Sequence, residues 1–234
     1  MIAEKRHRLL LASLILPALF LGILFHILLR RTETVILSDQ SPTLVIDPGH
    51  GGIDSGALGA DGTRESDLNL EIALRLRALA ELYGKENNLI RQDDSTHCDT
   101  EQYSEHRDLE CRAEETRKVQ NPVYISIHQN TFPTGQASGP QVIYAPGESS
   151  KLLGTLTHQN LLRTLYPDSR RVAEQSRGKL YILSNVQCPA VLVECGFLSN
   201  PVDLANLQRP GFQTSLAAVL MASYLQYLNN TKSI

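Results

Sequence analysis

The sequence predicts an α/β fold in which a mostly parallel, twisted sheet is flanked by helices. Two observations lead to this prediction: short runs of aliphatic and β-branched residues alternate with segments of helical periodicity, and turns rich in glycine or proline separate them. A third observation, an apolar stretch near the N-terminus, places a membrane anchor before the domain. We therefore expect an anchor at residues 1–31, a stalk at residues 32–42 and a single domain at residues 43–234.

The apolar stretch runs from Leu9 to Leu29 and is interrupted only by Ser13 and His26. About 20 apolar residues are enough to cross a bilayer as a helix. Basic residues flank both ends and no small-residue cleavage site follows, which favours an uncleaved signal-anchor over a cleaved signal peptide. The basic cluster is slightly larger before the stretch, so we expect a cytoplasmic N-terminus and a domain outside the membrane. A cleaved signal peptide would export the domain as well.

The first half of the domain begins with a strand at Thr43 to Ile46, where an apolar run stops at Asp47-Pro48. From Glu65 to Tyr83, apolar residues recur at spacings of three and four, which indicates an amphipathic helix. Gly84 is well placed to end that helix. Further along we expect a short strand at Leu89-Ile90 and a charged, exposed helix from Leu109 to Gln120.

The second half continues the alternation. The expected strands are Val123 to Ile127, Gln141 to Tyr144, Leu180 to Leu183 and Ala190 to Val193. The expected helices are Ser149 to Leu165 and Phe212 to Leu228, both amphipathic. Asn200-Pro201 has the pattern of a helix N-cap followed by proline at the first helical position.

Composition narrows the function. A formal net charge of −3 gives no electrostatic basis for binding nucleic acid, and we expect none. The four cysteines form no CxxC pair, which argues against a zinc ribbon or a thioredoxin-type site. Cys98 and Cys111 could pair in an oxidising exterior or stay free, and the sequence leaves both open. Cys195 is expected in the core, pointing away from the strand face that carries Glu194.

Three polar residues follow strands at their carboxyl ends, where a parallel sheet gathers its ligands, and a fourth opens the first helix. His50 lies in a glycine-rich loop after the first strand, His128 follows the central strand, and Glu65 opens the first helix. Two imidazoles and one carboxylate suit catalytic zinc, because they leave a fourth position for water. Glu194 follows the last strand, where partial burial would raise its pKa towards a value useful for a general base.

Four motifs carry a resemblance to a known family: D-P-G-H-G-G at Asp47 to Gly52, E-x-D-x-N-L at Glu65 to Leu70, S-I-H-x-N at Ser126 to Asn130 and V-E-x-G-F-L-S-N at Val193 to Asn200. In this order they resemble the zinc-dependent N-acetylmuramoyl-L-alanine amidases of the amidase_3 type, over Thr43 to Leu228. The resemblance implies that His50, Glu65 and His128 hold Zn²⁺ and that Glu194 is the catalytic acid and base. The implied substrate is peptidoglycan, cut between muramic acid and the L-alanine of its stem peptide.

A narrower resemblance rests on the predicted anchor and on R-x-x-x-x-S-R-G-K-L-Y-I-L at Arg171 to Leu183. Both are similar to the sporulation and germination amidases of the CwlD kind. This resemblance implies a role in spore cortex maturation through muramic-δ-lactam formation, or in germination. The implied partners are a muramic acid deacetylase or an activating lipoprotein. The sequence departs from the family at Ser66, Arg117 and Gln129, none of which is an implied ligand.

The remaining polar residues receive weaker predictions. Asn130 and Arg177 are expected substrate contacts, and the glycines around His50 are expected to keep that loop thin under a glycan strand. Asp47 either orients an imidazole or only ends its strand, and Asp54 is expected to be an ordinary loop acid. We expect the remaining domain histidines at the surface: His97, His106 and His158.

Three other functions remain open. The protein could be a general vegetative amidase of cell separation. It could also be a zinc peptidase or deacetylase acting on another amide. Finally, the domain could bind peptidoglycan without cutting it.

Overall fold

The computed structural model describes residue 22, residues 42–98 and residues 103–231. Within these ranges six strands form one sheet, in the spatial order β2-β1-β3-β6-β4-β5. The strands are β1 (Thr43–Pro48), β2 (Asn87–Leu89), β3 (Pro122–Asn130), β4 (Gln141–Tyr144), β5 (Glu174–Gln175) and β6 (Ala190–Phe197). Every neighbouring pair is parallel except β4 and β6, which run antiparallel. The sheet is therefore mixed, and parallel pairing dominates it, as predicted.

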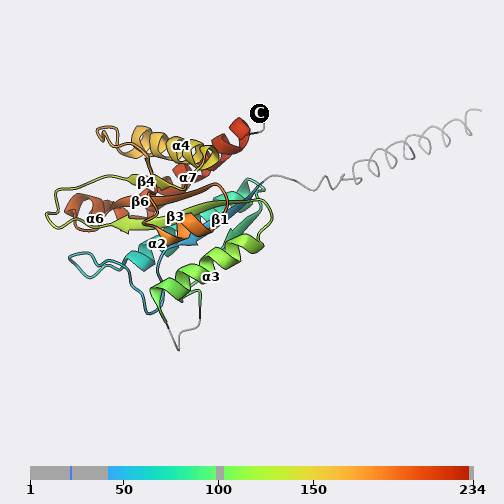
Figure 1. Ribbon diagram of the computed structural model, residues 1–234. Coiled ribbons are helices and arrows are strands. Elements are labelled where there is room, and N and C mark those ends of the chain that lie inside the picture. The colour runs from blue at the N-terminus through green and yellow to red at the C-terminus, as the bar shows by residue number, and fades with distance from the viewer. Residues whose placement is uncertain (1–21, 23–41, 99–102, 232–234) are drawn as a thin grey trace, which may run out of the picture. The chain divides into compact units, whose positions relative to one another are not determined.

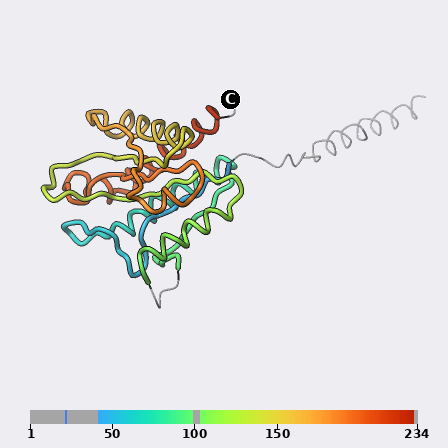
Figure 2. The backbone as a smooth tube through the Cα atoms, viewed as in Figure 1, coloured from blue at the N-terminus to red at the C-terminus, as the bar shows by residue number. Residues whose placement is uncertain are grey.

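Helices cover both faces of this sheet. They are α2 (Glu65–Leu82), α3 (Glu105–Lys118), α4 (Glu148–Leu165), α5 (Tyr181–Asn185), α6 (Pro201–Leu207) and α7 (Pro210–Thr231). Figure 1 shows α4 and α7 on one side of the sheet and α3 on the other. Figure 2 follows the chain from the blue β1 to the red α7, which packs beside α4.

The alternation of side chains along β1 explains these two layers, since successive residues of a strand face opposite sides of a sheet. Leu44 and Ile46 are fully buried in the larger core with α2, α4 and α7. Val45 lies between them in sequence and is buried in the second core, against residues of α3 and α5. One three-residue run thus contributes to both cores.

The topology gathers the predicted site at one edge of the sheet. Strands β1, β3 and β6 are adjacent and parallel, so their carboxyl ends lie together. His128 and Glu194 are direct register partners across β3 and β6. The register shifts between His128 and Asn130, an irregularity often found beside active sites.

Two local predictions are wrong. Residues 180–183 do not form a strand, because Tyr181–Asn185 is the short helix α5, and β4 pairs instead with β5. A short apolar run does not distinguish a strand from one helical turn, and here Ile182 and Leu183 bury against the α3 side. His158 is not at the surface: it is buried in α4, and its Nε2 donates to the carbonyl of Arg171 at 2.7 Å.

The membrane anchor is outside the described part of the chain. The predicted segment from Leu9 to Leu29 lies there except for Gly22, as does the stalk up to residue 41. Among the helices of the described residues, none has the length and apolar character needed to span a bilayer. The anchor therefore stays a prediction.

Helix α3 is less exposed than its charged sequence predicts, because Arg112 is buried. Its guanidinium donates to Asp47 Oδ1 at 2.5 Å, to Asp108 Oδ2 at 2.6 Å and to the carbonyl of His50 at 2.8 Å. Asp47 also accepts a hydrogen bond from Tyr124. Asp47 thus pairs with a buried arginine near the end of β1, an interaction that neither expectation included.

Replacing Arg112 with methionine is expected to destabilise the protein by about 3–5 kcal/mol, because two carboxylates would stay buried without their cation. Chemical denaturation at pH 7 measures the free energy of unfolding. Arg75→Ala is the control, since Arg75 forms an exposed pair with Glu71 at 3.6 Å that should contribute less than about 0.5 kcal/mol. Equal losses in the two variants would show that the buried network contributes nothing special.

Candidate metal centre

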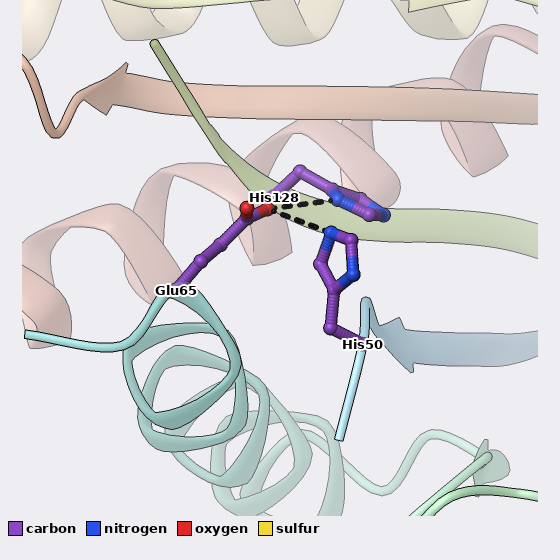
Figure 3. A group of neighbouring side chains, drawn as sticks. All are labelled: His50, Glu65 and His128. Atoms are coloured by element: carbon purple, nitrogen blue, oxygen red, sulfur yellow. Dashed lines mark hydrogen bonds and ion pairs between the residues drawn. The ribbon is translucent and has the colours of Figure 1, made fainter. Parts of the chain in front are cut away.

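Three potential metal ligands converge at the carboxyl edge of the sheet. His50 comes from the loop after β1, Glu65 from the first turn of α2 and His128 from β3 (Figure 3). Glu65 Oε1 lies 3.0 Å from His128 Nδ1 and 3.3 Å from His50 Nε2. One donor atom from each residue lies within 4.8 Å of the others. The structure thus brings the three predicted residues together.

These residues fit zinc by chemistry and by spacing. Zinc ligands about 2.0–2.1 Å from a tetrahedral ion lie roughly 3.3 Å apart, close to the two separations measured from Glu65. Both imidazole nitrogens face a carboxylate oxygen, which accepts hydrogen bonds but donates none when ionised. A metal ion would therefore replace the protons between these atoms.

His50 is held by a second carboxylate, that of Asp54, so the expectation of an ordinary loop acid there is wrong. Its Nδ1 lies 2.7 Å from Asp54 Oδ2, which leaves Nε2 directed at Glu65. Burial lowers the pKa of His50, but hydrogen bonds to Asp54 and Glu65 outweigh burial and raise the pKa to about 10. A carboxylate on the distal nitrogen fixes the tautomer and the orientation of a ligand histidine. The sequence signal for Asp54 is its place four residues after His50 in the same loop.

The glycines of this loop make room for protein groups. A Cβ on Gly49 would lie 2.1 Å from the His128 ring, and one on Gly56 would lie 2.7 Å from Glu65 Oε2. These two positions therefore require glycine for steric reasons, and the expected passage of a glycan strand over the loop stays a prediction. His50 itself has a φ of 61°, a conformation that costs energy outside glycine and is often found at functional sites.

Glu65 is fixed by backbone donors on both sides. Its carboxylate accepts hydrogen bonds from the N–H groups of Ala57 at 2.9 Å and Gln129 at 3.1 Å. Burial raises the pKa of Glu65, but hydrogen bonds to His128 and His50 prevail and hold the pKa well below its usual value. Gln129 is one of the departures from the family pattern. Its side chain also donates to Asn69 at 3.1 Å, which helps to hold the site in place.

Glu194 stands beside the cluster with a free oxygen. It is the register partner of His128, and its Oε2 is buried without a hydrogen-bond partner in the described structure. Burial raises the pKa of Glu194 to about 7, against the opposing charge of His128. A carboxyl group with a pKa near neutrality can both take up and release a proton at neutral pH.

The raised pKa of Glu194 predicts a pH-dependent cost to stability in the metal-free protein. Below about pH 4.5, the carboxyl is neutral in the folded and the unfolded state. As pH rises from there to the folded pKa of about 7, the carboxyl ionises in the unfolded state but stays neutral in the folded state. The free energy of unfolding therefore falls over this range. Glu194→Gln should therefore stabilise the metal-free protein at pH 8 by on the order of 1–3 kcal/mol, and by little at pH 4.5. Denaturation at both pH values with chelator present measures this, and an equal effect at both would contradict it.

The two expected substrate contacts line cavities that do not include the three clustered residues. Asn130 donates to Gln141 Oε1 at 3.2 Å and lines a cavity of about 470 Å³ with Arg171 and Phe197. Arg177 lines a separate cavity of about 380 Å³ with residues of β5. Neither cavity includes a member of the metal cluster, so their roles stay predictions.

Known proteins resemble this chain in sequence and in structure. The model of the family Amidase_3, described as N-acetylmuramoyl-L-alanine amidase, matches residues 44–223. A germination-specific N-acetylmuramoyl-L-alanine amidase of Bacillus subtilis (strain 168) is 33% identical over 190 residues, which cover 79% of this chain and 78% of the relative.

Two solved structures share the fold. The CwlD amidase of Clostridioides difficile, solved in complex with the GerS lipoprotein, matches with a TM-score of 0.75 and 33% identity over 80% of this chain and 98% of the other. The N-acetylmuramoyl-L-alanine amidase AmiC2 of Nostoc punctiforme matches with a TM-score of 0.71 and 29% identity, over 81% of this chain and 98% of the other.

Proposed function

The chain belongs to the Amidase_3 family of N-acetylmuramoyl-L-alanine amidases, and we propose that it hydrolyses peptidoglycan with a zinc ion held by His50, Glu65 and His128. The bond cut is the amide between the lactyl group of muramic acid and L-alanine. The observation that carries the proposal is the convergence of two imidazoles and a carboxylate beside the unpartnered oxygen of Glu194.

Each residue has a distinct part in the proposed reaction. Bound zinc supplies a Lewis acid that polarises the scissile carbonyl and acidifies a water molecule. Glu194 takes the proton of the attacking water and delivers it to the L-alanine nitrogen, so that the amine leaves neutral. Asp54 holds the His50 ring through Nδ1 and keeps Nε2 available as a ligand atom.

The biological setting proposed is the spore. The relative from Bacillus subtilis is germination-specific by name, and the CwlD structure contains a lipoprotein. Cleavage frees the lactyl carboxyl of muramic acid, and a deacetylase acting on the same sugar frees the amine that closes a muramic-δ-lactam. A deacetylase and an activating lipoprotein are accordingly the proposed partners.

The proposed layout is an anchor at residues 1–31, a stalk at residues 32–42 and the amidase domain at residues 43–234. Action outside the cytoplasm is consistent with the cell-wall relatives. Asn130 and Arg177 are kept as proposed substrate contacts, since each lines a cavity with other polar side chains.

Digestion of purified sacculi tests the activity. With zinc, mass spectrometry should find glycans with a free lactyl carboxyl and peptides with N-terminal L-alanine. Chelator should prevent both products. A cut at another amide would identify a peptidase, loss of acetyl groups would identify a deacetylase, and binding without products would identify a wall-binding domain.

Complementation tests the setting. The gene is expressed in Bacillus subtilis lacking its germination-specific amidase, and the muramic-δ-lactam of the spores is measured. Restored lactam with the wild-type chain, but not with Glu194→Gln, is the expected result. Active protein that restores no lactam would favour a vegetative role in cell separation.

A further inference from the structure

A disulfide lies close to the loop that carries His50. Cys98 and Cys111 are bonded, which joins the segment after β2 to helix α3. The sequence left this pairing open. The other two cysteines are free: Cys195 is buried, as predicted, and Cys188 is half-buried. Residues near each of the two bonded cysteines are linked to His50 by hydrogen bonds, along two separate routes.

The first route reaches the imidazole. The Tyr103 hydroxyl donates to Asp54 Oδ2 at 3.0 Å, and the same oxygen lies 2.7 Å from His50 Nδ1. Burial, and then the charge and hydrogen bond of Asp54, raise the pKa of Tyr103, so the phenol stays protonated and can only donate to the carboxylate. A phenol, a carboxylate and an imidazole thus form a continuous chain that ends at a proposed zinc ligand.

The second route reaches the backbone. Arg112 follows Cys111 directly and donates to the carbonyl of His50 at 2.8 Å. Its Nε donates to Asp108 Oδ2 at 2.6 Å, while Asp108 Oδ1 accepts from the backbone N–H of Cys98 at 3.3 Å. Both cysteines of the disulfide therefore adjoin groups that fix the loop.

Both routes act on a residue whose backbone is strained. His50 has a φ of 61°, a conformation that persists only where neighbouring contacts enforce it. Its ring must also keep one nitrogen directed at Glu65 while the other donates to Asp54. Side chains that hold a ligand in its bound geometry reduce the cost of ordering it when the metal binds.

We propose that Tyr103 is a positioning residue for His50, acting through Asp54, and that the Cys98–Cys111 disulfide holds Tyr103 and Arg112 in place. The affinity for zinc thus depends on a phenol and a disulfide that do not touch the metal. This inference rests on the proposed function, in which His50 is a ligand.

Tyr103→Phe tests the first part, because it removes only the hydroxyl. Zinc affinity is measured by competition with a chromogenic chelator and is expected to fall roughly 3–10-fold, less than the roughly 10–100-fold typical of a direct partner such as Asp54. The visible absorption spectrum of the Co²⁺-loaded protein should change, because the ring of a ligand moves. The melting temperature of the metal-free protein should stay the same.

Tyr181→Phe is the matched control for metal binding. Tyr181 lines the same cavity of about 370 Å³ as Tyr103, and its ring packs against His106 with centroids 4.7 Å apart. Its zinc affinity should equal that of the wild type. Unchanged zinc affinity and an unchanged Co²⁺ spectrum in Tyr103→Phe would overturn the role of Tyr103. A lowered melting temperature of the metal-free protein with unchanged affinity would do the same, since the role would then be structural.

The double variant Cys98→Ser/Cys111→Ser tests the second part, with Cys188→Ser as the control. The double variant should bind zinc about tenfold more weakly at a temperature where the metal-free protein is fully folded. Adding Tyr103→Phe to it should cost less than Tyr103→Phe costs in the wild type, because the two changes share one route. Additive losses would contradict the coupling.

Zinc binding by the wild type and by the variants distinguishes a failure of the proposed function from a failure of the positioning role. If the wild type bound no zinc, the proposed function would fail before the variants were compared. If the wild type bound zinc tightly and all variants matched it, the function would stand and the positioning role of Tyr103 and the disulfide would fall.

Discussion

Replacing Glu194 with glutamine is expected to lower kcat on peptidoglycan by about 10²–10⁴-fold while the protein still binds one zinc ion. Glutamine has nearly the shape of glutamate but cannot carry a proton between the water and the leaving nitrogen. Glu194 lies beside the cluster as the register partner of His128, and it is not one of the three clustered donors. The effect should therefore fall on the chemical step. Rates of peptide release from sacculi, with zinc content measured in parallel, test this.

The control for Glu194→Gln is Glu148→Gln in the first turn of α4, where the carboxylate is 90% exposed and pairs with Lys151 at 3.5 Å. That variant should keep wild-type activity. If Glu194→Gln lost its zinc, Glu194 would be a ligand. If it kept more than about a tenth of the wild-type kcat, another group would have to move the proton.

Glu65→Gln is the second large effect. The substitution removes the only negative charge among the three clustered donors and leaves two imidazoles to hold the ion. Zinc affinity should fall by more than the roughly 10–100-fold seen when an outer partner of a ligand is lost. Activity at stoichiometric zinc should disappear, and excess zinc should restore part of it. Chelator competition and activity assays measure both effects.

Asp67→Asn is the control for Glu65→Gln, because it removes another acid from the first turn of α2. Asp67 is half exposed and lies 3.6 Å from Arg64, away from the metal cluster. Its zinc affinity should not change. Comparable losses in both variants would mean that the charge of the helix terminus, and not direct ligation by Glu65, governs binding.

The sequence predicted the layout of the site because the topology of a parallel sheet constrains it. His128 and Glu194 lie on adjacent parallel strands, and His50 follows the third, so their proximity follows from strand order alone. Glu65 was predictable as the first residue of a strongly periodic helix. At that terminus the helix dipole favours an anion.

Residues that act through long-range contacts were not predictable in this way. Arg112 read as one charge among many on a helix, since nothing local shows that its partner Asp47 lies 65 residues earlier. Tyr103 donates to an aspartate 49 residues away, and only the folded loop brings the two together. His158 was expected at the surface, since nothing local shows that its imidazole is buried and bonds to the carbonyl of Arg171, which lies in a loop 13 residues later.

The prediction of helices and strands was wrong where the local sequence pattern was ambiguous. Tyr181 to Leu183 is apolar enough for a strand or for a helical turn, and packing against α3 decided for the helix α5. Helix α3 begins at Glu105, four residues before its expected start, because Ser104 caps it by accepting from the N–H of Arg107 at 3.2 Å. These errors lie away from the three clustered donors, so they did not affect the site prediction.

The most direct test of the proposed metal centre is an anomalous difference map at the zinc absorption edge from crystals of the zinc-loaded domain. We expect one peak about 2.0–2.2 Å from His50 Nε2, His128 Nδ1 and a carboxylate oxygen of Glu65, with Glu194 outside bonding distance. A peak that lacked any of the three ligands, or one bonded to Glu194, would contradict this expectation.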